Sequence, residues 1–94
     1  MRFAARVLCR IETRREKATL VVRLAGRLGE AHVPDLLAAC AQASHPIVEL
    51  DELVSADAVG LDALLRIEEH GARLVGLPQY LRLKLETLAR DRGR

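Results

Sequence analysis

The chain has 94 residues, of which 50% are hydrophobic and 30% are charged, a composition typical of one folded domain with a single small core. Its only aromatic residues are Phe3 and Tyr80, so the core is expected to be built from aliphatic side chains. The net charge of +2 gives no strong field that would attract nucleic acid or a membrane surface, and the aromatic platforms of single-stranded nucleic-acid sites are missing.

The first part of the chain has the pattern of a β-hairpin. Residues 3–13 alternate with period two, which predicts a strand whose odd positions face the core. The polar stretch at 14–18 predicts a turn, and residues 19–26 predict a second strand. The short connection favours antiparallel pairing of the two strands. The second strand is expected to direct inward Leu20, Val22 and Leu24.

Basic residues occupy even positions of the first strand, among them Arg6 and Arg10. This row has two interpretations, a phosphate-binding patch or the solvated face of a sheet. The solvated face is preferred, because Leu8 and Glu12 interrupt the row.

The middle of the chain alternates helical and strand patterns. Pro34 marks the start of a helix that is expected to end near Ser44. Its apolar face has the spacing i, i+3, i+4, i+7, in Val33, Leu36, Leu37 and Cys40. After Pro46, the apolar run at 47–50 predicts a third strand.

The segment VSADAVGLDALL, residues 54–65, predicts a turn that opens into a second helix, which ends at Gly71. Asp62 and Arg66 form an i, i+4 pair on its polar stripe. The inward side chains are expected to be Leu61, Leu64, Leu65 and Ile67.

Residues 72–77 predict a fourth strand, and the segment after Pro78 is ambiguous. LRLKLE alternates with period two, yet Leu81, Leu85 and Leu88 also fit one helical face. The helix is preferred because proline suits a first helical turn, and the closing RDRGR is expected to fray. The predicted order is β-β-α-β-α-β-α, an α/β fold with a small mixed sheet and helices packed on one face.

The two cysteines, Cys9 and Cys40, form no CxxC motif and fall on apolar stripes. They are interpreted as buried thiols in a reducing compartment. No signal peptide or bilayer-spanning stretch is recognisable, so a cytoplasmic protein is expected. No metal spacing links His32, His45 and His70, and no catalytic set is evident, so neither an enzyme nor a cofactor is expected.

The same order of elements, with LAGRL, IVELDELVSADAVGLDALL and ARLVGLP, resembles the STAS domain family, whose best-known members are bacterial anti-sigma factor antagonists. The resemblance covers residues 19–90 of one domain spanning 1–94, with a strand and turn before it at 1–18 and a tail after it at 91–94.

The resemblance assigns roles to particular positions. Asp57, Gly60 and Leu61 match the family's loop, and Glu49 matches its acidic or amide strand position. Ala58 stands where phosphorylatable members carry the serine that a partner kinase modifies. A further departure is Gly29, at a position where many members have Asp.

The resemblance therefore implies a non-catalytic binding module that docks to an anti-sigma factor or a switch-type kinase and regulates transcription without a phosphorylation switch. The docking residues implied are Asp57, Ala58, Val59, Gly60 and Leu61. The alternative is an accessory STAS subunit of an Mla-type lipid-transport ABC complex, bound to the ATPase. A nucleotide sensor is a third interpretation, although no phosphate-binding glycine loop is present.

Three side-chain features carry plainer interpretations. Asp57 is expected to cap the second helix, whether or not it also contacts a partner. Ser55 is the nearest hydroxyl to position 58, and it is interpreted as a strand-end residue rather than a displaced phosphorylation site. An outward stripe, either a contact surface or ordinary exposure, is formed by Tyr80, Leu83 and Thr87.

Overall fold

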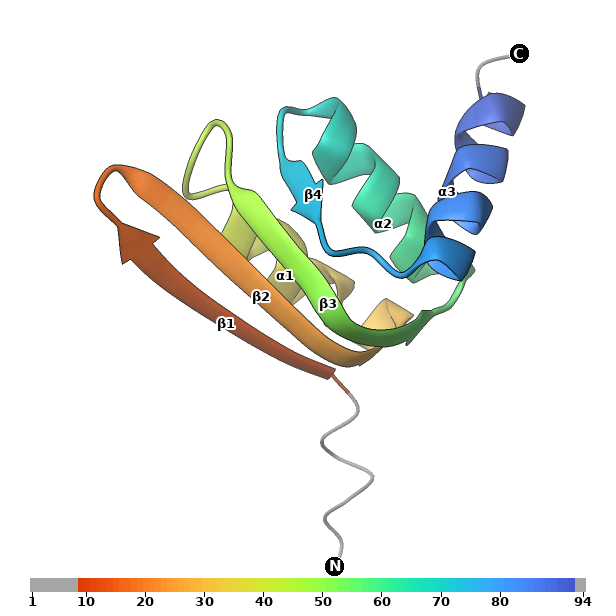
Figure 1. Cartoon of the computed structure of the whole chain (residues 1–94), viewed down its shortest axis with the longest axis horizontal. Coiled ribbons are helices and arrows are strands. Elements are labelled where there is room, and N and C mark those ends of the chain that lie inside the picture. The colour runs from red at the N-terminus through yellow and green to blue at the C-terminus, as the bar shows by residue number, and fades with distance from the viewer. Residues whose placement is uncertain (1–8, 93–94) are drawn as a thin grey trace, which may run out of the picture.

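A computed structural model, which describes residues 9–92, shows a four-stranded mixed sheet with its helices on one face (Figure 1). The sheet order is β1-β2-β3-β4, with β1 antiparallel to β2 and the other neighbours parallel. The α/β class and the predicted order of strands and helices are confirmed. In chain order the elements are β1 (Cys9–Glu16), β2 (Thr19–Leu28), the short 3-10 helix η2 (Glu30–His32), α1 (Val33–Cys40), β3 (Ile47–Ala56), α2 (Ala58–Glu69), β4 (Arg73–Val75) and α3 (Gln79–Arg92).

One aliphatic core lies between the sheet and the helices. The predicted inward face of β2 is confirmed, because Leu20, Val22 and Leu24 are all buried. They pack with fully buried side chains of β3 and of the three α-helices, Val48, Leu50, Leu36, Leu64, Leu81 and Leu85. The helical interpretation of the last segment is confirmed. Leu81 and Leu85, which are four residues apart, are buried in α3, whereas Leu83 between them is exposed. Among residues 9–92, no helix has both the length and the apolar character needed to cross a bilayer.

The hairpin is longer than the sequence predicted. The turn expected over 14–18 contains only two residues, because β1 continues to Glu16, which pairs with Thr19. Polar side chains extend β1 at little cost, since they lie at the sheet's edge in contact with water. Thr13 was expected inside, but it is exposed at this edge. The part of the predicted first strand before Cys9 lies outside the described residues.

Three other boundaries differ from the prediction. The first helix ends at Cys40 and not near Ser44, and β4 spans only Arg73–Val75. The third strand continues well beyond residue 50, because its parallel pairing with β2 extends to the Leu28–Ala56 pair through two register shifts.

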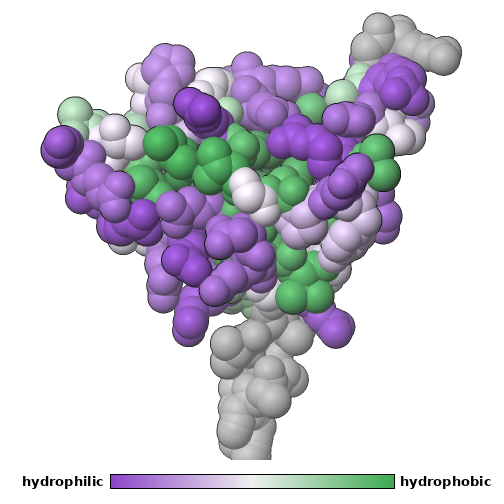
Figure 2. Space-filling model, viewed as in Figure 1, coloured by the Kyte–Doolittle hydropathy of each residue, from purple (hydrophilic) through white to green (hydrophobic). Residues whose placement is uncertain are grey.

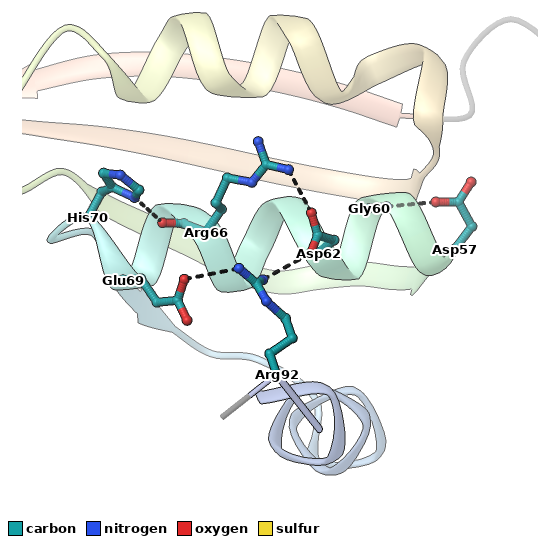
Figure 3. Close-up of polar contacts among 7 residues, drawn as sticks. All are labelled: Asp57, Gly60, Asp62, Arg66, Glu69, His70 and Arg92. Carbon is teal, nitrogen blue, oxygen red and sulfur yellow. Dashed lines mark hydrogen bonds and ion pairs between the residues drawn. The ribbon is translucent and has the colours of Figure 1, made fainter. Parts of the chain in front are cut away.

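The end of α3 is held by charged contacts, so the expectation of a frayed RDRGR is wrong as far as Arg92 (Figure 3). The guanidinium of Arg92 lies 2.9 Å from Asp62 Oδ1 and 3.6 Å from Glu69 Oε1. Asp62 also accepts from Arg66, at 2.9 Å, which confirms the predicted i, i+4 pair. Two arginines and two carboxylates thus connect the polar side of α2 to the end of α3.

The two cysteines differ in burial. Cys40, the last residue of α1, is buried, as predicted, and burial raises the pKa of its thiol to about 11. The prediction that Cys9 is also buried is wrong, because this residue lies on the edge strand and is partly exposed. Its partial burial still raises the pKa of its thiol.

We expect native Cys40 to react with a thiol reagent much more slowly than native Cys9. The pKa of about 11, against 9.0 for a model thiol, lowers the thiolate fraction of Cys40 about a hundredfold at mildly alkaline pH. Burial further limits access of the reagent. Peptide mass spectrometry of a labelling time course measures both rates, and unfolding in denaturant should make them similar. Equal native rates would contradict the edge position of Cys9.

Candidate functional site

Asp57 lies at the junction between β3 and α2, and both of its carboxylate oxygens accept backbone hydrogen bonds. The N–H of Gly60 donates to Oδ1 at 2.7 Å, which confirms the predicted helix cap (Figure 3). The N–H of Glu30 donates to Oδ2 at 3.1 Å. In addition, the N–H of Asp57 donates to the carbonyl of Leu28 at 3.1 Å. Asp57 therefore joins the start of α2 to the segment that follows β2.

Gly60 brings the first turn of α2 against the end of β2. It is buried, and a Cβ at this position would lie 2.7 Å from the carbonyl oxygen of Leu28 and 3.0 Å from Leu28 Cγ. A backbone oxygen cannot move aside without shifting the strand. Gly60 therefore lets the start of α2 approach the sheet closely.

The other loop residues lie on the outside of this turn. Ala58 is the first residue of α2 and is exposed, and Val59 is 42% exposed. Leu61 is partly buried against the core. Of the five predicted docking residues, Gly60 thus contributes through packing, and the others present surface to the solvent.

A shallow groove of about 400 Å³ extends from this loop to α3. Ala58 and Leu61 line one wall. The opposite wall is formed by α3, through Leu83, Lys84, Thr87, Leu88 and Asp91. Leu83, which lines this wall, is 55% exposed. The loop and the outward stripe of the last helix, which the sequence presents separately, form one apolar surface.

The open face of the sheet, on the side away from the helices, carries mainly paired charges. Glu49, which matches the acidic strand position of the family resemblance, lies there and not at the loop, with its Oε2 3.2 Å from Arg14. Arg14 also pairs with Glu16 at 2.7 Å. These hydrogen bonds, first to Glu16 and then to Glu49, raise the pKa of the Arg14 guanidinium.

Carboxylates also pair with two other arginines of the described strands on this face. Arg10 lies 3.5 Å from Glu12, and Arg23 lies 2.9 Å from Glu52. Figure 2 views this face and shows hydrophobic surface over the middle of the sheet, surrounded by hydrophilic side chains. The described part of the arginine row is therefore not an uncompensated phosphate patch, and Arg6 lies outside the described residues.

The remaining candidate residues are dispersed. Nδ1 of His70 lies 2.8 Å from the carbonyl oxygen of Arg66, at the end of α2, whereas Nδ1 of His45 lies 3.3 Å from that of Gly71. Within residues 9–92, no group of three or more His, Cys, Asp or Glu side chains is placed to hold a metal ion. Ser55 lies opposite Arg27 near the end of β3, and its assignment as an unmodified residue stays a prediction.

Two parts of the site were missed by the sequence analysis. The contact between Glu30 N–H and the Asp57 carboxylate has no local signal, because the two residues are far apart in the chain. The α3 wall of the groove had a weak signal, the outward stripe at Tyr80, Leu83 and Thr87, but its position beside Ala58 depends on tertiary packing.

Comparison with solved structures identifies two similar proteins. One is the STAS domain of an anti-sigma-factor antagonist from Rhodobacter sphaeroides, with a TM-score of 0.56 and 23% identity over 74% of this chain and 88% of that one. The other is the anti-sigma factor antagonist SpoIIAA in its unphosphorylated form, with a TM-score of 0.61 and 20% identity over 90% of this chain and 100% of that one. The sequence itself matches no protein-family model and no curated protein. The structural likeness shows that the chain has the STAS fold.

The close approach at Gly60 predicts the sign of a mutational effect. In an unconstrained helix, Gly→Ala would stabilise by about 1 kcal/mol. Here we expect Gly60→Ala to lower the free energy of unfolding by about 1 to 3 kcal/mol, because the added Cβ meets backbone. The control is Gly29→Ala, whose Cβ would lie at an ordinary 3.4 Å from Asp57 Oδ2 and should be nearly neutral. Urea unfolding measures both, and a stabilised Gly60→Ala variant would contradict the contact.

Proposed function

We propose that this chain is a non-catalytic protein-binding module of the anti-sigma factor antagonist type, which docks through the Asp57–Leu61 loop and α2 and lacks a serine phosphorylation switch. The observation that carries this proposal is the position of Ala58. Its methyl group is exposed at the start of α2, at the edge of the apolar groove shared with α3. The STAS fold of the chain supports the comparison with antagonists that bind protein partners.

The chemistry of position 58 supports a docking surface that is always available. A phosphoryl group at a helix start adds about −1.5 to −2 charge, and the partial positive charge of the helix end stabilises it there. Such a charge would be tolerated by the fold but would oppose docking of an apolar partner surface. Alanine has no oxygen to accept the phosphoryl group, so this means of release is absent at position 58.

The composition of the surface indicates what kind of contact it makes. Val59 and Leu83 present exposed apolar side chains, and Tyr80 is 50% exposed on the same helix as Leu83. Lys84 and Asp91 supply charge of both signs along the α3 wall. An apolar centre with a polar rim is the usual anatomy of a protein–protein interface. We therefore expect the partner to place apolar side chains in the groove.

The environment of Asp57 supports a structural role for this side chain. Its two oxygens accept backbone N–H groups, at 2.7 and 3.1 Å, so the carboxylate holds the loop in place.

Capture of the partner tests the proposed class. The full chain, immobilised and exposed to native lysate, should retain an anti-sigma factor or a switch-type kinase, identified by mass spectrometry. Retention of an ABC ATPase instead would support the accessory role in a lipid transporter. Retention should be lost when the bait carries a charge at position 58.

We expect Ala58→Glu to weaken binding to the captured partner at least about tenfold, because a carboxylate would be desolvated without a partner in the contact. Ala58→Ser should bind nearly as well as the unmodified chain. The control is Ala38→Glu, the same substitution at an exposed position of α1, which should leave affinity unchanged. The melting temperature of Ala58→Glu should be preserved, since negative charge near a helix start is favourable.

Three results would contradict this proposal. Equal binding by Ala58→Glu would show that the partner docks elsewhere. Unfolding of that variant would show that residue 58 supports the core. Phosphate found by mass spectrometry on Ser55 of protein from its native cells, with a loss of binding, would show that a switch exists at another hydroxyl.

A further inference from the structure

Strand β1 forms one edge of the sheet, and no described strand lies beyond it (Figure 1). It contains eight residues, Cys9–Glu16, all paired with β2 on one side. The other side of β1 presents backbone N–H and C=O groups with no ladder partner among the described residues. An edge of this length is a template for a further strand.

The register of the hairpin decides which backbone groups point outward. Glu16 and Thr19 flank a two-residue turn, so they form a hydrogen-bonded pair of the antiparallel ladder. Hydrogen-bonded pairs alternate along a strand, so the even residues of β1 direct their backbone groups toward β2. The outward-directed N–H and C=O groups therefore belong to the odd residues, Cys9, Ile11, Thr13 and Arg15.

The side chains of the even residues alternate in sign along the open face, in the order Arg10, Glu12, Arg14 and Glu16. This order is complementary to itself when the strand is reversed. In an antiparallel pair of two β1 strands centred on Thr13, Arg10 lies opposite Glu16 and Glu12 lies opposite Arg14. Every charge of this row then meets the opposite charge, and opposite-charge pairs across strands are stabilising.

The neighbouring registers do not have this property. A shift of the centre to residue 12 would place Arg10 opposite Arg14 and Glu12 opposite its own copy. A shift to residue 14 would place Glu12 opposite Glu16 and Arg14 opposite its own copy. Like charges across a strand pair are destabilising, so these two registers are disfavoured. A centre at residue 11 or 15 pairs only two members of the row, Arg10 with Glu12 or Arg14 with Glu16, so the register centred on Thr13 makes the most opposite-charge contacts.

We propose that two copies of this chain associate through antiparallel pairing of their β1 strands, centred on Thr13, to form one continuous eight-stranded sheet. The outward backbone groups of Ile11, Thr13 and Arg15 supply the ladder, since Thr13 faces Thr13 and Ile11 faces Arg15 in this register. The charge row supplies the specificity. The contact surface is small, so we expect a reversible dimer of modest affinity.

This association leaves the proposed docking surface accessible. The groove is lined by α2 and α3. In the chain, α2 connects β3 to β4, and both of these strands lie on the opposite side of β2 from β1. A two-fold axis through Thr13 would give a dimer with two separate grooves. The inference is independent of which partner, if any, the groove binds.

Sedimentation velocity of the full chain tests the proposal, over concentrations from low micromolar to near millimolar. Arg10→Glu and Glu16→Arg should each weaken association at least about tenfold, because each creates two like-charge contacts across the two-fold axis. An equimolar mixture of the two variants should associate like the unmodified chain, since the carboxylate introduced in one variant then meets the guanidinium introduced in the other. Arg90→Glu, the same charge change at an exposed position of α3, is the control and should have no effect.

Hydrogen exchange of the unmodified chain provides a test that does not depend on variants. With rising concentration, the amides of Ile11, Thr13 and Arg15 should exchange more slowly. A chain that stays monomeric over the whole range would overturn the proposal. So would variants that associate as strongly as the unmodified chain, or a mixture that does not recover association.

Discussion

The carboxylate of Asp57 organises the functional end of this domain. Its two oxygens accept the N–H of Gly60 at 2.7 Å and the N–H of Glu30 at 3.1 Å, so one side chain fixes both the start of α2 and the segment after β2. Gly60 completes the junction, because only a residue without Cβ lets the first turn rest on the Leu28 carbonyl. The exposed position of Ala58 follows from these two constraints. With α2 capped and seated in this way, the outer side of its first turn faces solvent and adjoins α3.

The two faces of the sheet serve different purposes. The helix-covered face carries the aliphatic core, and the open face carries arginines that are paired with glutamates. Paired charges in water contribute little stability but keep a sheet face soluble and restrict the ways in which strands can add to its edge. One exposed apolar surface lies between α2 and α3, which carry the exposed side chains of Val59, Tyr80 and Leu83. Another lies over the middle of the sheet's open face (Figure 2). An apolar surface lies beside the Asp57–Leu61 loop, and the hydrogen bonds of Asp57 hold that loop in place.

The spacing of hydrophobic residues predicted an element well where one face of that element is buried, because burial then gives the sequence a regular period. Leu20, Val22 and Leu24 alternate because one face of β2 is buried, and the pattern is visible in the sequence. The boundaries that were wrong depend on distant partners. β3 extends to Ala56 because β2 is long enough to pair with it. α3 extends to Arg92 because the guanidinium of Arg92 forms ion pairs with Asp62 and Glu69 of α2. The error at Cys9 has a similar cause, since period two specifies which way a side chain points but not whether the strand is at an edge.

The sequence by itself determined the order of elements, the aliphatic core, the cap at Asp57 and the absence of a hydroxyl at position 58. These depend on residue type and on spacing within one turn or one strand, so they can be identified from neighbours in the chain. Only the tertiary structure decided that Glu30 shares the Asp57 carboxylate, that Glu49 faces Arg14 on the open side, and that α3 lies beside Ala58 to form a groove. These contacts join residues far apart in the chain, and their geometry is set by how the helices pack on the sheet, which no local pattern encodes.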